Sequence, residues 1–385
     1  MNNPVQAVPS QVVELSADLP KGTCRAKTRD ICRLLTSAAG LDRRVTPKGL
    51  GRLAKKTIGI LIISVLSLSP VIWTACDFSK STTPSTQSVV RLTVGTAAND
   101  LSSLIWIAKV RGYFSEQQLD IDFKIYESGH LAIGDLLAGK LDLATATEFA
   151  AVRHGLERTD FRIISILDQT RDQQIVARKD HGINHQSDLK NKRVGVALNT
   201  SSEYYLHLLL VLQGIRPEDV RIVDLLPSEQ VAAIARGEID AAIVWEPFAS
   251  MMKKELGKNA VSWQGQSGQD EYWLLLGTLG AIEKQSSAIP RFLKALASAE
   301  DFIKNNETAA MGIVEKQLES RHLGSLWMNH RFRLGLHRPL ILKMEAELRW
   351  LRSGLHAPKP DILDLLDFIY VDALKSVEPN KINML

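Results

Sequence analysis

Cysteine is scarce in this chain of 385 residues, which holds only Cys24, Cys32 and Cys76. Because no cysteine follows Cys76, the rest of the chain can have neither a disulfide framework nor a cysteine-based metal site. The nine histidines are scattered. His181 and His185 are four residues apart, but they fall in a predicted loop, and a zinc site needs three or four convergent ligands. The sequence therefore predicts no metal site.

Recognisable catalytic motifs are also missing. The sequence has no Gly-x-Ser-x-Gly, no phosphate-cradling glycine loop, no zinc motif and no paired carboxylates in a supporting context. Positive charge is concentrated in residues 1–56, which carry a net charge of +7, and the remaining residues together carry −3. A slightly acidic body has no nucleic-acid footprint. We therefore expect no enzyme, no cofactor and no nucleic-acid partner.

A long apolar run occurs in one place, from Thr57 to Trp73. Basic residues precede it, and Ala75 and Cys76 follow, which is the signal-peptide pattern. A signal that ends on a cysteine resembles that of a bacterial lipoprotein, in which the cysteine is lipidated and becomes the mature N-terminus. The departure is Trp73, where an aliphatic residue is usual. An uncleaved membrane anchor and a plain secretory signal are the alternatives, since the run is at the short end for spanning a bilayer.

The segments around this run have distinct compositions. Residues 1–56 form a basic extension that we expect to be disordered or absent from the mature protein. A start codon assigned too far upstream would explain a signal this far into the chain. Residues 57–76 are the signal and lipobox-like segment. Residues 77–90 are rich in serine and threonine, which predicts a flexible tether.

One stretch of the chain occurs twice. Its copies are Gly-Lys-Leu-Asp-Leu-Ala-Thr-Ala-Thr-Glu-Phe-Ala at 139–150 and Gly-Glu-Ile-Asp-Ala-Ala-Ile-Val-Trp-Glu-Pro-Phe-Ala at 237–249. In each copy a glycine ends a helix, a short apolar run follows as a strand covered on both faces, and a second helix begins. Thr147 is the predicted N-cap of that helix in the first copy, and Pro247 its first residue in the second.

The repeat extends upstream of these stretches. Val94-Gly95 and Val194-Gly195 are each followed by a polar segment and a helix, so residues 92–150 and 193–249 look like two copies of one βαβαβ-like unit. Strands that alternate with helices indicate parallel sheets. The sequence therefore predicts an α/β protein with two similar lobes and a cleft between them.

Ligands of such sheets bind outside the carboxyl ends of the strands. Residues that follow strands in the two lobes should therefore face each other across the cleft. The predicted ligand-binding residues are Asn99, Ser102, Ser103, Thr147, Gln169, Asn199, Thr200, Ser201, Ser202, Trp245 and Glu246.

The segment from Asn199 to Ser202 should lie at a helix N-terminus, where free backbone N–H groups, hydroxyls and the helix dipole suit an oxyanion. A single residue that caps the helix is the alternative for these hydroxyls. Trp245 could stack on a planar or apolar part of a ligand, or belong to the core. Glu148 and Glu246 fit helix-start acids. If both instead face the ligand, a cationic or hydrogen-bond-donating solute is favoured.

With these residues placed, the chain resembles a solute-binding protein of an ABC importer, in the nitrate/sulfonate/taurine branch. The resemblance covers roughly residues 90–385, and three segments carry it: the region from Asn99 to Phe114, residues 187–196 and residues 237–248. It implies a type II periplasmic-binding fold with two crossings between the lobes. The expected divisions are lobe one at 91–178, lobe two at 179–274 and a C-terminal helical part at 275–385 that packs on lobe one.

The same resemblance implies the function. A lipid-anchored monomer in the periplasm, or on the outer face of the cytoplasmic membrane, would capture a small solute and deliver it to a permease. A same-fold enzyme that acts on a pyrimidine-like substrate is one alternative, although that enzyme family uses a cysteine-rich motif that this chain lacks. A ligand-sensing domain for a membrane partner is the other.

Overall fold

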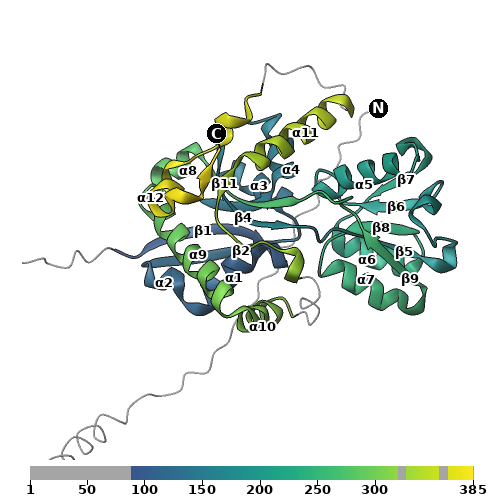
Figure 1. Ribbon diagram of the computed structural model, residues 1–385, viewed down its shortest axis with the longest axis horizontal. Helices are drawn as coiled ribbons and strands as arrows, with labels where there is room; N and C mark the ends of the chain where they lie inside the picture. Colours follow the sequence, from purple (N-terminus) through teal and green to yellow (C-terminus); the bar gives the residue numbers. More distant parts are fainter. Residues whose placement is uncertain (1–87, 320–326, 355–362, 385) are drawn as a thin grey trace, which may run out of the picture. The chain divides into compact units, whose positions relative to one another are not determined.

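The computed structural model describes residues 88–319, 327–354 and 363–384 (Figure 1). The predicted basic extension, the signal segment and the lipidation site at Cys76 lie outside these residues, as does most of the predicted tether. None of the helices in the described part of the chain combines the length and the apolar character that a bilayer crossing requires.

The first lobe is built on a five-stranded sheet with the order β2-β1-β3-β10-β4. Strand β1 pairs in parallel with β2 and β3, whereas β10 runs antiparallel to both β3 and β4. The strands are β1 (Val90–Ala97), β2 (Leu119–Tyr126), β3 (Leu143–Thr147), β4 (Phe161–Thr170) and β10 (Glu271–Thr278). Strand β3 is apolar and almost wholly buried, as the sequence predicts.

The second lobe repeats this arrangement in a sheet with the order β7-β6-β8-β5-β9. Here β5 is the antiparallel strand, in the place that β10 takes in the first sheet. The strands are β5 (Gln174–Arg178), β6 (Arg193–Val196), β7 (Arg221–Asp224), β8 (Ala241–Val244) and β9 (Ala260–Gln264). Each sheet therefore takes its antiparallel strand from the chain that has just arrived from the other lobe.

Two segments cross between the sheets, residues 171–173 and residues 265–270. The sequence places residues 174–178 in lobe one and residues 271–274 in lobe two, whereas both segments pair in the opposite sheet. The difference arises because the first strand after each crossing runs antiparallel at its destination, and an apolar run does not reveal which sheet it joins.

Helices surround the two sheets (Figure 1). Lobe one carries α1 (Ser103–Arg111), α2 (Tyr113–Glu116), α3 (Gly129–Leu137) and α4 (Glu148–Gly155), and lobe two carries α5 (Ser201–Leu212), α6 (Pro227–Arg236) and α7 (Phe248–Leu256). The C-terminal part contains α8 (Leu279–Lys284), α9 (Ala288–Asn305), α10 (Glu307–Gln317), α11 (Arg338–Gly354), α12 (Asp372–Val377) and the short strands β11 (Leu336–His337) and β12 (Ile382–Asn383). Helix α7 starts one residue after Pro247, which occupies the N-cap.

The C-terminal part packs on lobe one. Helix α9 contacts α1 and α2, and α11 contacts α4. Helix α11 also reaches lobe two, where Trp350 meets the ring of Tyr204 on α5 edge-on at a centroid distance of 5.6 Å. The C-terminal part therefore touches both lobes.

The two copies of the internal repeat match in backbone conformation and in strand register. Gly139 and Gly237 follow helices with φ of 73° and 74°, in the left-handed region that the sequence predicts for them. Val94-Gly95 pairs with Leu143-Ala144 in the same register in which Val194-Gly195 pairs with Ala241-Ala242.

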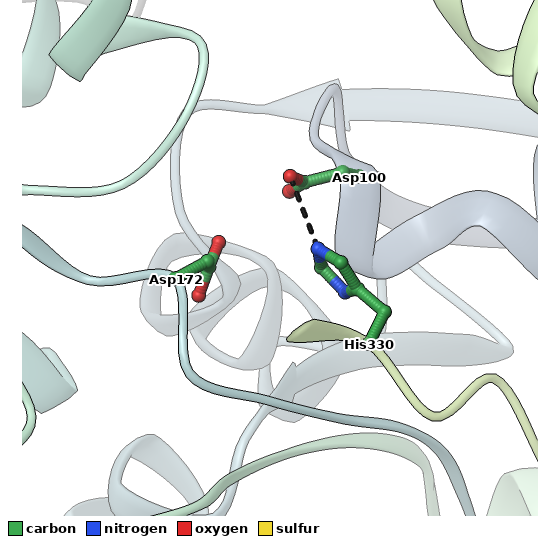
Figure 2. Close-up of side chains that lie close together, drawn as sticks. All are labelled: Asp100, Asp172 and His330. Carbon is green, nitrogen blue, oxygen red and sulfur yellow. Dashed lines mark ion pairs between the residues drawn. The ribbon is translucent and has the colours of Figure 1, made fainter. Parts of the chain in front are cut away.

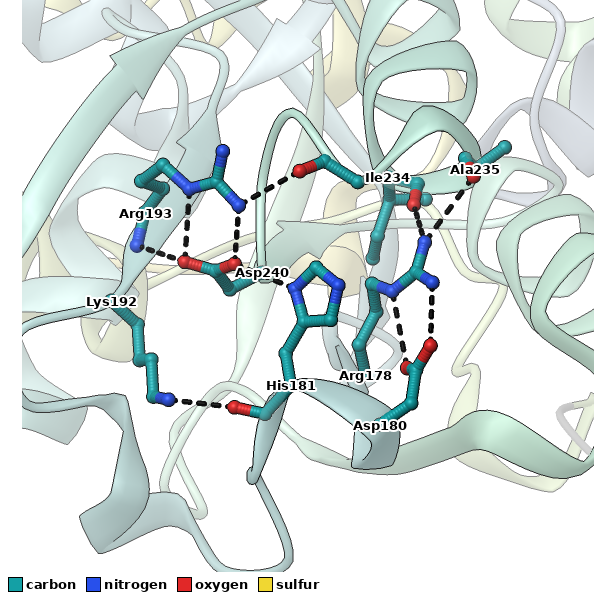
Figure 3. Close-up of polar contacts among 9 residues, drawn as sticks. Arg178, Asp180, His181, Lys192, Arg193, Ile234, Ala235 and Asp240 are labelled. Atoms are coloured by element: carbon teal, nitrogen blue, oxygen red, sulfur yellow. Dashed lines mark hydrogen bonds and ion pairs between the residues drawn. The ribbon is translucent and has the colours of Figure 1, made fainter.

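The aspartate of each repeated stretch has a structural role. Asp142 accepts a hydrogen bond from the backbone N–H of Thr93 at 2.8 Å, and Asp240 accepts one from that of Arg193 at 2.8 Å. The Arg193 guanidinium and His181 Nδ1 also form hydrogen bonds with Asp240, at 2.6 and 2.8 Å (Figure 3). These contacts hold the pKa of Asp240 well below its usual range, against the opposing effect of burial. The repeated aspartate therefore ties the third strand of each unit to the first.

Candidate functional site

A small cavity of about 20 Å³ lies between the two lobes. Both lobes and the first crossing, through Gln173, contribute to its walls. The lining residues are Asn99, Leu101, Ser128, Gly129, His130, Thr147, Ala150, Gln173, Thr200, Ser201, Trp245, Glu271 and Trp273.

Lobe one supplies residues that follow its parallel strands. Asn99 comes after β1, the segment from Ser128 to His130 after β2, and Thr147 is the last residue of β3. The Thr147 hydroxyl accepts a hydrogen bond from the Ala150 N–H at 3.4 Å, so it caps α4 as predicted while also lining the cavity. The parallel sheet therefore brings three separate segments to one edge.

Lobe two supplies the start of α5 and the residue after β8. Thr200 is the N-cap of α5, but its hydroxyl donates to the Ala197 carbonyl at 2.6 Å and does not cap the helix. Ser201 is the first residue of α5, and Trp245 follows β8 directly. These three residues complete the wall opposite lobe one.

Two helix N-termini of opposite lobes thus meet at one cavity. Helix α3 begins at Gly129 and α5 at Ser201, and neither has a side-chain cap on its first turn. The N-terminus of a helix carries a partial positive charge and free N–H groups, so it attracts anions. The arrangement favours a ligand with an anionic group.

Gln173 of the first crossing and the start of β10 form the third side of the cavity. Glu271 is buried, and burial raises the pKa of its carboxyl although Ser201 and Gln173 beside it act in the other direction. Trp273 is also buried, and its indole N–H has no partner within the described residues. A buried donor without a partner is costly unless a ligand or water accepts from it.

Hydrogen bonds connect the lobes near this cavity. Arg153 Nε on α4 donates to Asn199 Oδ1 at 3.1 Å, and the Ser228 hydroxyl on α6 donates to Glu127 at 2.9 Å. The lobes are therefore in direct polar contact in this conformation.

Five of the eleven predicted residues line the cavity: Asn99, Thr147, Thr200, Ser201 and Trp245. The other six have partners elsewhere. Ser102 bonds Thr96 and Asn99, Ser103 bonds the Asp100 carbonyl, Gln169 bonds Asp270, Asn199 bonds Arg153, Ser202 bonds Gln173, and Glu246 bonds Gln174 and the Ser250 N–H. Glu246 keeps its predicted helix-start role, and it lines a separate groove.

The sequence interpretation missed eight lining residues: Leu101, Ser128, Gly129, His130, Ala150, Gln173, Glu271 and Trp273. The segment from Ser128 to His130 had a usable signal, because it follows a strand and begins a helix as the predicted residues do. Gln173 had none, because the crossing that positions it has no pattern in the sequence. Glu271 had none either, because an apolar run does not show that β10 returns to the first sheet.

A family model described as NMT1/THI5 like matches residues 101–310. The chain belongs to this family. A taurine-binding periplasmic protein of Escherichia coli (strain K12) is 28% identical over 195 residues, which are 49% of this chain and 59% of that protein. A protein of Brucella abortus (strain 2308), provisionally named as a binding protein, is 25% identical over 224 residues, 57% of this chain and 68% of its own length.

A solved structure supports the fold assignment for this family member. The alkanesulfonate-binding protein SsuA from Xanthomonas axonopodis pv. citri, bound to MOPS, aligns with a TM-score of 0.61 at 17% identity. The alignment covers 71% of this chain and 96% of that protein. The predicted two-lobed periplasmic-binding fold is confirmed, and the relatives with a named ligand bind small solutes.

A histidine pair beside the cavity should make stability depend on pH. His130 Nδ1 lies 3.1 Å from His154 Nε2, and burial, with His154 next in effect, lowers the pKa of His130 to about 4. Burial also lowers the pKa of His154. Between pH 6.5 and 4 the unfolded chain gains protons that the folded chain excludes, so stability should fall as pH falls. The slope per histidine should stay below about 1.4 kcal/mol per pH unit, because both rings are partly solvated.

Urea unfolding at pH 7.5, 6 and 5 measures this slope. His130→Asn should flatten it, whereas the control His185→Gln, at an exposed position, should leave it unchanged. If His130→Asn shows the wild-type dependence of stability on pH, the His130–His154 pair does not cause that dependence.

Proposed function

We propose that this chain is the extracytoplasmic solute-binding component of an ABC importer, and that its solute carries a small oxyanion group such as a sulfonate. The observation that carries the proposal is the convergence of two helix N-termini without side-chain caps, α3 from lobe one and α5 from lobe two, on one cavity. Membership of a family whose relatives include a taurine-binding protein agrees with it.

The mechanism follows from the position of the cavity. A solute bound between the lobes contacts both, so it stabilises the closed arrangement over an open one by its differential affinity. The crossings are the natural hinges, because within the described residues only 171–173 and 265–270 join the two sheets. The closed form is what the permease would recognise.

The solute would leave unchanged. No cysteine follows Cys76, so the chemistry of the related pyrimidine-forming enzymes has no residue to perform it. We further propose that the protein acts as a monomer, anchored by a lipid on Cys76, in the periplasm or on the outer face of the cytoplasmic membrane. Mass analysis of the mature N-terminus tests the lipid, and product analysis after incubation with candidate solutes tests the absence of turnover.

A thermal-shift screen of the purified protein tests the ligand class. The panel contains nitrate, sulfate, bicarbonate, alkyl and aryl sulfonates, taurine and thiamine-precursor pyrimidines. A ligand present at a hundred times its dissociation constant stabilises the fold by about 2.7 kcal/mol. We expect a sulfonate among the hits. A thermal shift with a pyrimidine but with none of the anions would favour the enzyme alternative. No shift with any compound of the panel would favour a partner-sensing domain.

The indole N–H of Trp273 should contribute to the affinity for the solute by donating a hydrogen bond to it. Trp273→Phe keeps most of the ring and removes the buried donor, so the affinity for the best anionic hit should fall about tenfold to a hundredfold. Trp263→Phe is the matched control, because Trp263 lines the other groove. Isothermal titration of both variants measures the difference. Equal affinities of wild type and Trp273→Phe would exclude Trp273 as a ligand donor.

A further inference from the structure

A group of buried ionisable side chains lies outside the solute cavity. Asp100 belongs to a 3-10 helix (Asp100–Ser102) after β1, Asp168 to β4, Asp172 to the first crossing and His330 to the C-terminal part. All four are buried. Figure 2 shows Asp100, Asp172 and His330 turned toward one another from three separate segments.

The contacts in this group are incomplete. His330 Nδ1 lies 2.6 Å from Asp168 Oδ2, in hydrogen-bonding geometry. His330 Nε2 lies 3.3 Å from Asp100 Oδ2, but this pair does not form a hydrogen bond. Neither carboxylate oxygen of Asp100 or of Asp172 has a hydrogen-bond partner among the described residues. The carboxylates of Asp100 and Asp172 and the Nε2 atom of His330 thus converge without hydrogen-bond partners in the described part of the chain, with the His330–Asp100 ion pair as their one close contact.

Buried charges are normally paired or coordinate a metal. One atom from each of Asp100, Asp172 and His330 lies within 4.8 Å of the other two. Two ligands at the usual zinc distances in a tetrahedron are about 3.4 Å apart, by simple geometry from bond lengths of about 2.0–2.2 Å. The separation of 3.3 Å between His330 Nε2 and Asp100 Oδ2 is close to such an edge.

We propose that Asp100, Asp172 and His330 bind a divalent transition-metal ion, with zinc the best match to the ligand spacing. Imidazole together with carboxylates suits this class of ion better than calcium or magnesium, which prefer oxygen ligands alone. Asp172 would move slightly toward the ion to shorten its separation from the other two.

Asp168 is a positioning residue in this arrangement. A metal-binding histidine usually donates its second ring N–H to a carboxylate, which fixes the ring and directs the other nitrogen at the ion. The bond from His330 Nδ1 to Asp168 has this form and leaves Nε2 facing Asp100. The separate groove that Glu246 lines would give the ion a route in, because Asp172 and Asn329, the neighbour of His330, both line it.

The metal would act on the hinge. Asp100 lies in lobe one, Asp172 lies in the segment that crosses to lobe two, and His330 belongs to the C-terminal part. One ion would hold these three segments together beside Gln173, which lines the solute cavity. No pattern in the sequence indicates this site, because the three ligands are 72 and 158 residues apart and share no motif.

The test uses the full-length chain, stripped with EDTA and titrated with Zn²⁺, Mn²⁺, Co²⁺ and Ca²⁺. We expect one equivalent of Zn²⁺ to remain after gel filtration by metal analysis, with a higher thermal midpoint. His330→Gln should lose this equivalent, and Asp168→Asn should weaken it about tenfold to a hundredfold. His181→Gln, which alters the other histidine paired to an aspartate, should retain it.

Several results would overturn the proposal. They are the absence of a tightly bound transition metal in the wild type, binding of Ca²⁺ alone, or zinc retention by His330→Gln equal to that of the wild type. If the wild type binds no transition metal tightly, a bound proton would be what relieves the repulsion between the carboxylates. If His330→Gln does not fold, the absorption spectrum of the Co²⁺-loaded wild type decides, because His and carboxylate coordination in a four-coordinate site gives intense visible bands that octahedral aqueous Co²⁺ lacks.

Discussion

Replacing Lys343 with alanine should lower the free energy of unfolding by about 3–5 kcal/mol, because it leaves buried carboxylates without their cation. Lys343 Nζ lies 3.4 Å from Glu347 Oε1 and 4.4 Å from the ring centroids of both Tyr204 and Tyr205. Its ammonium also donates to Gln269 at 2.8 Å. The Lys343 side chain is only 8% exposed and that of Glu347 is fully buried. Few ion pairs in the described chain are so completely removed from water.

The loss of unfolding free energy in Lys343→Ala should grow with pH. Burial raises the pKa of Glu347 to about 7, with Lys343 acting to lower it. Without the ammonium the folded chain should hold the Glu347 proton to higher pH, whereas the unfolded chain releases it near its ordinary value. The folded state then binds more protons, so its stability declines as pH rises above that value and keeps declining beyond 7. Urea unfolding at pH 6 and pH 8.5 measures the difference.

Helix α11 offers a matched control. Arg349 Nη1 and Glu345 Oε2 form an i,i+4 pair on the same helix, 3.9 Å apart and largely exposed. Arg349→Ala should therefore cost less than about 0.5 kcal/mol. The double variant Lys343→Met/Glu347→Leu, which removes both charges, should recover most of the loss. If Lys343→Ala were as mild as Arg349→Ala, the buried pair would contribute nothing specific to the packing of α11 on α5.

This pair also marks a limit of prediction from the sequence. The helical spacing of Leu340, Met344, Leu348 and Leu351 predicts a buried stripe, and all four are buried. Lys343 and Glu347 lie beside that stripe with the i,i+4 spacing of an ordinary surface ion pair. They are buried because α11 has a second partner, α5 of the other lobe, and no pattern local to α11 announces it.

The cavity residues also divide into those that the sequence could predict and those that it could not. Thr147, Thr200 and Trp245 could be predicted because each lies at or within a few residues of the end of a strand, and strand ends follow from apolar patterning and the repeat. Ser102 and Ser202 fulfilled the same rule but turn to protein partners, since orientation within a helical turn depends on neighbours distant in sequence. Glu271 and Trp273 reach the cavity only because β10 returns to the first sheet, which a reading of local segments does not reveal.

Gly129→Ala should destabilise the protein and weaken solute binding together. A Cβ atom at this position would lie 2.4 Å from Ala146 Cα and 2.7 Å from its Cβ, so the backbone of α3 or β3 must move. Overpacking of this kind costs about 1–3 kcal/mol. Because Ser128, Gly129 and His130 line the cavity, the displaced helix start should also lower the affinity for an anionic solute by about tenfold or more.

Gly134→Ala separates the steric effect from the loss of a glycine. Gly134 lies in the same helix, is exposed, and has no atom within 4 Å of its would-be Cβ. This variant should gain about 0.5–1 kcal/mol, because alanine restricts the unfolded chain and favours the helix. Its solute affinity should equal that of the wild type in isothermal titration. A Gly129→Ala protein that is destabilised but binds with unchanged affinity would mean that the start of α3 does not hold the solute, and the anion site would then rest on the start of α5 alone.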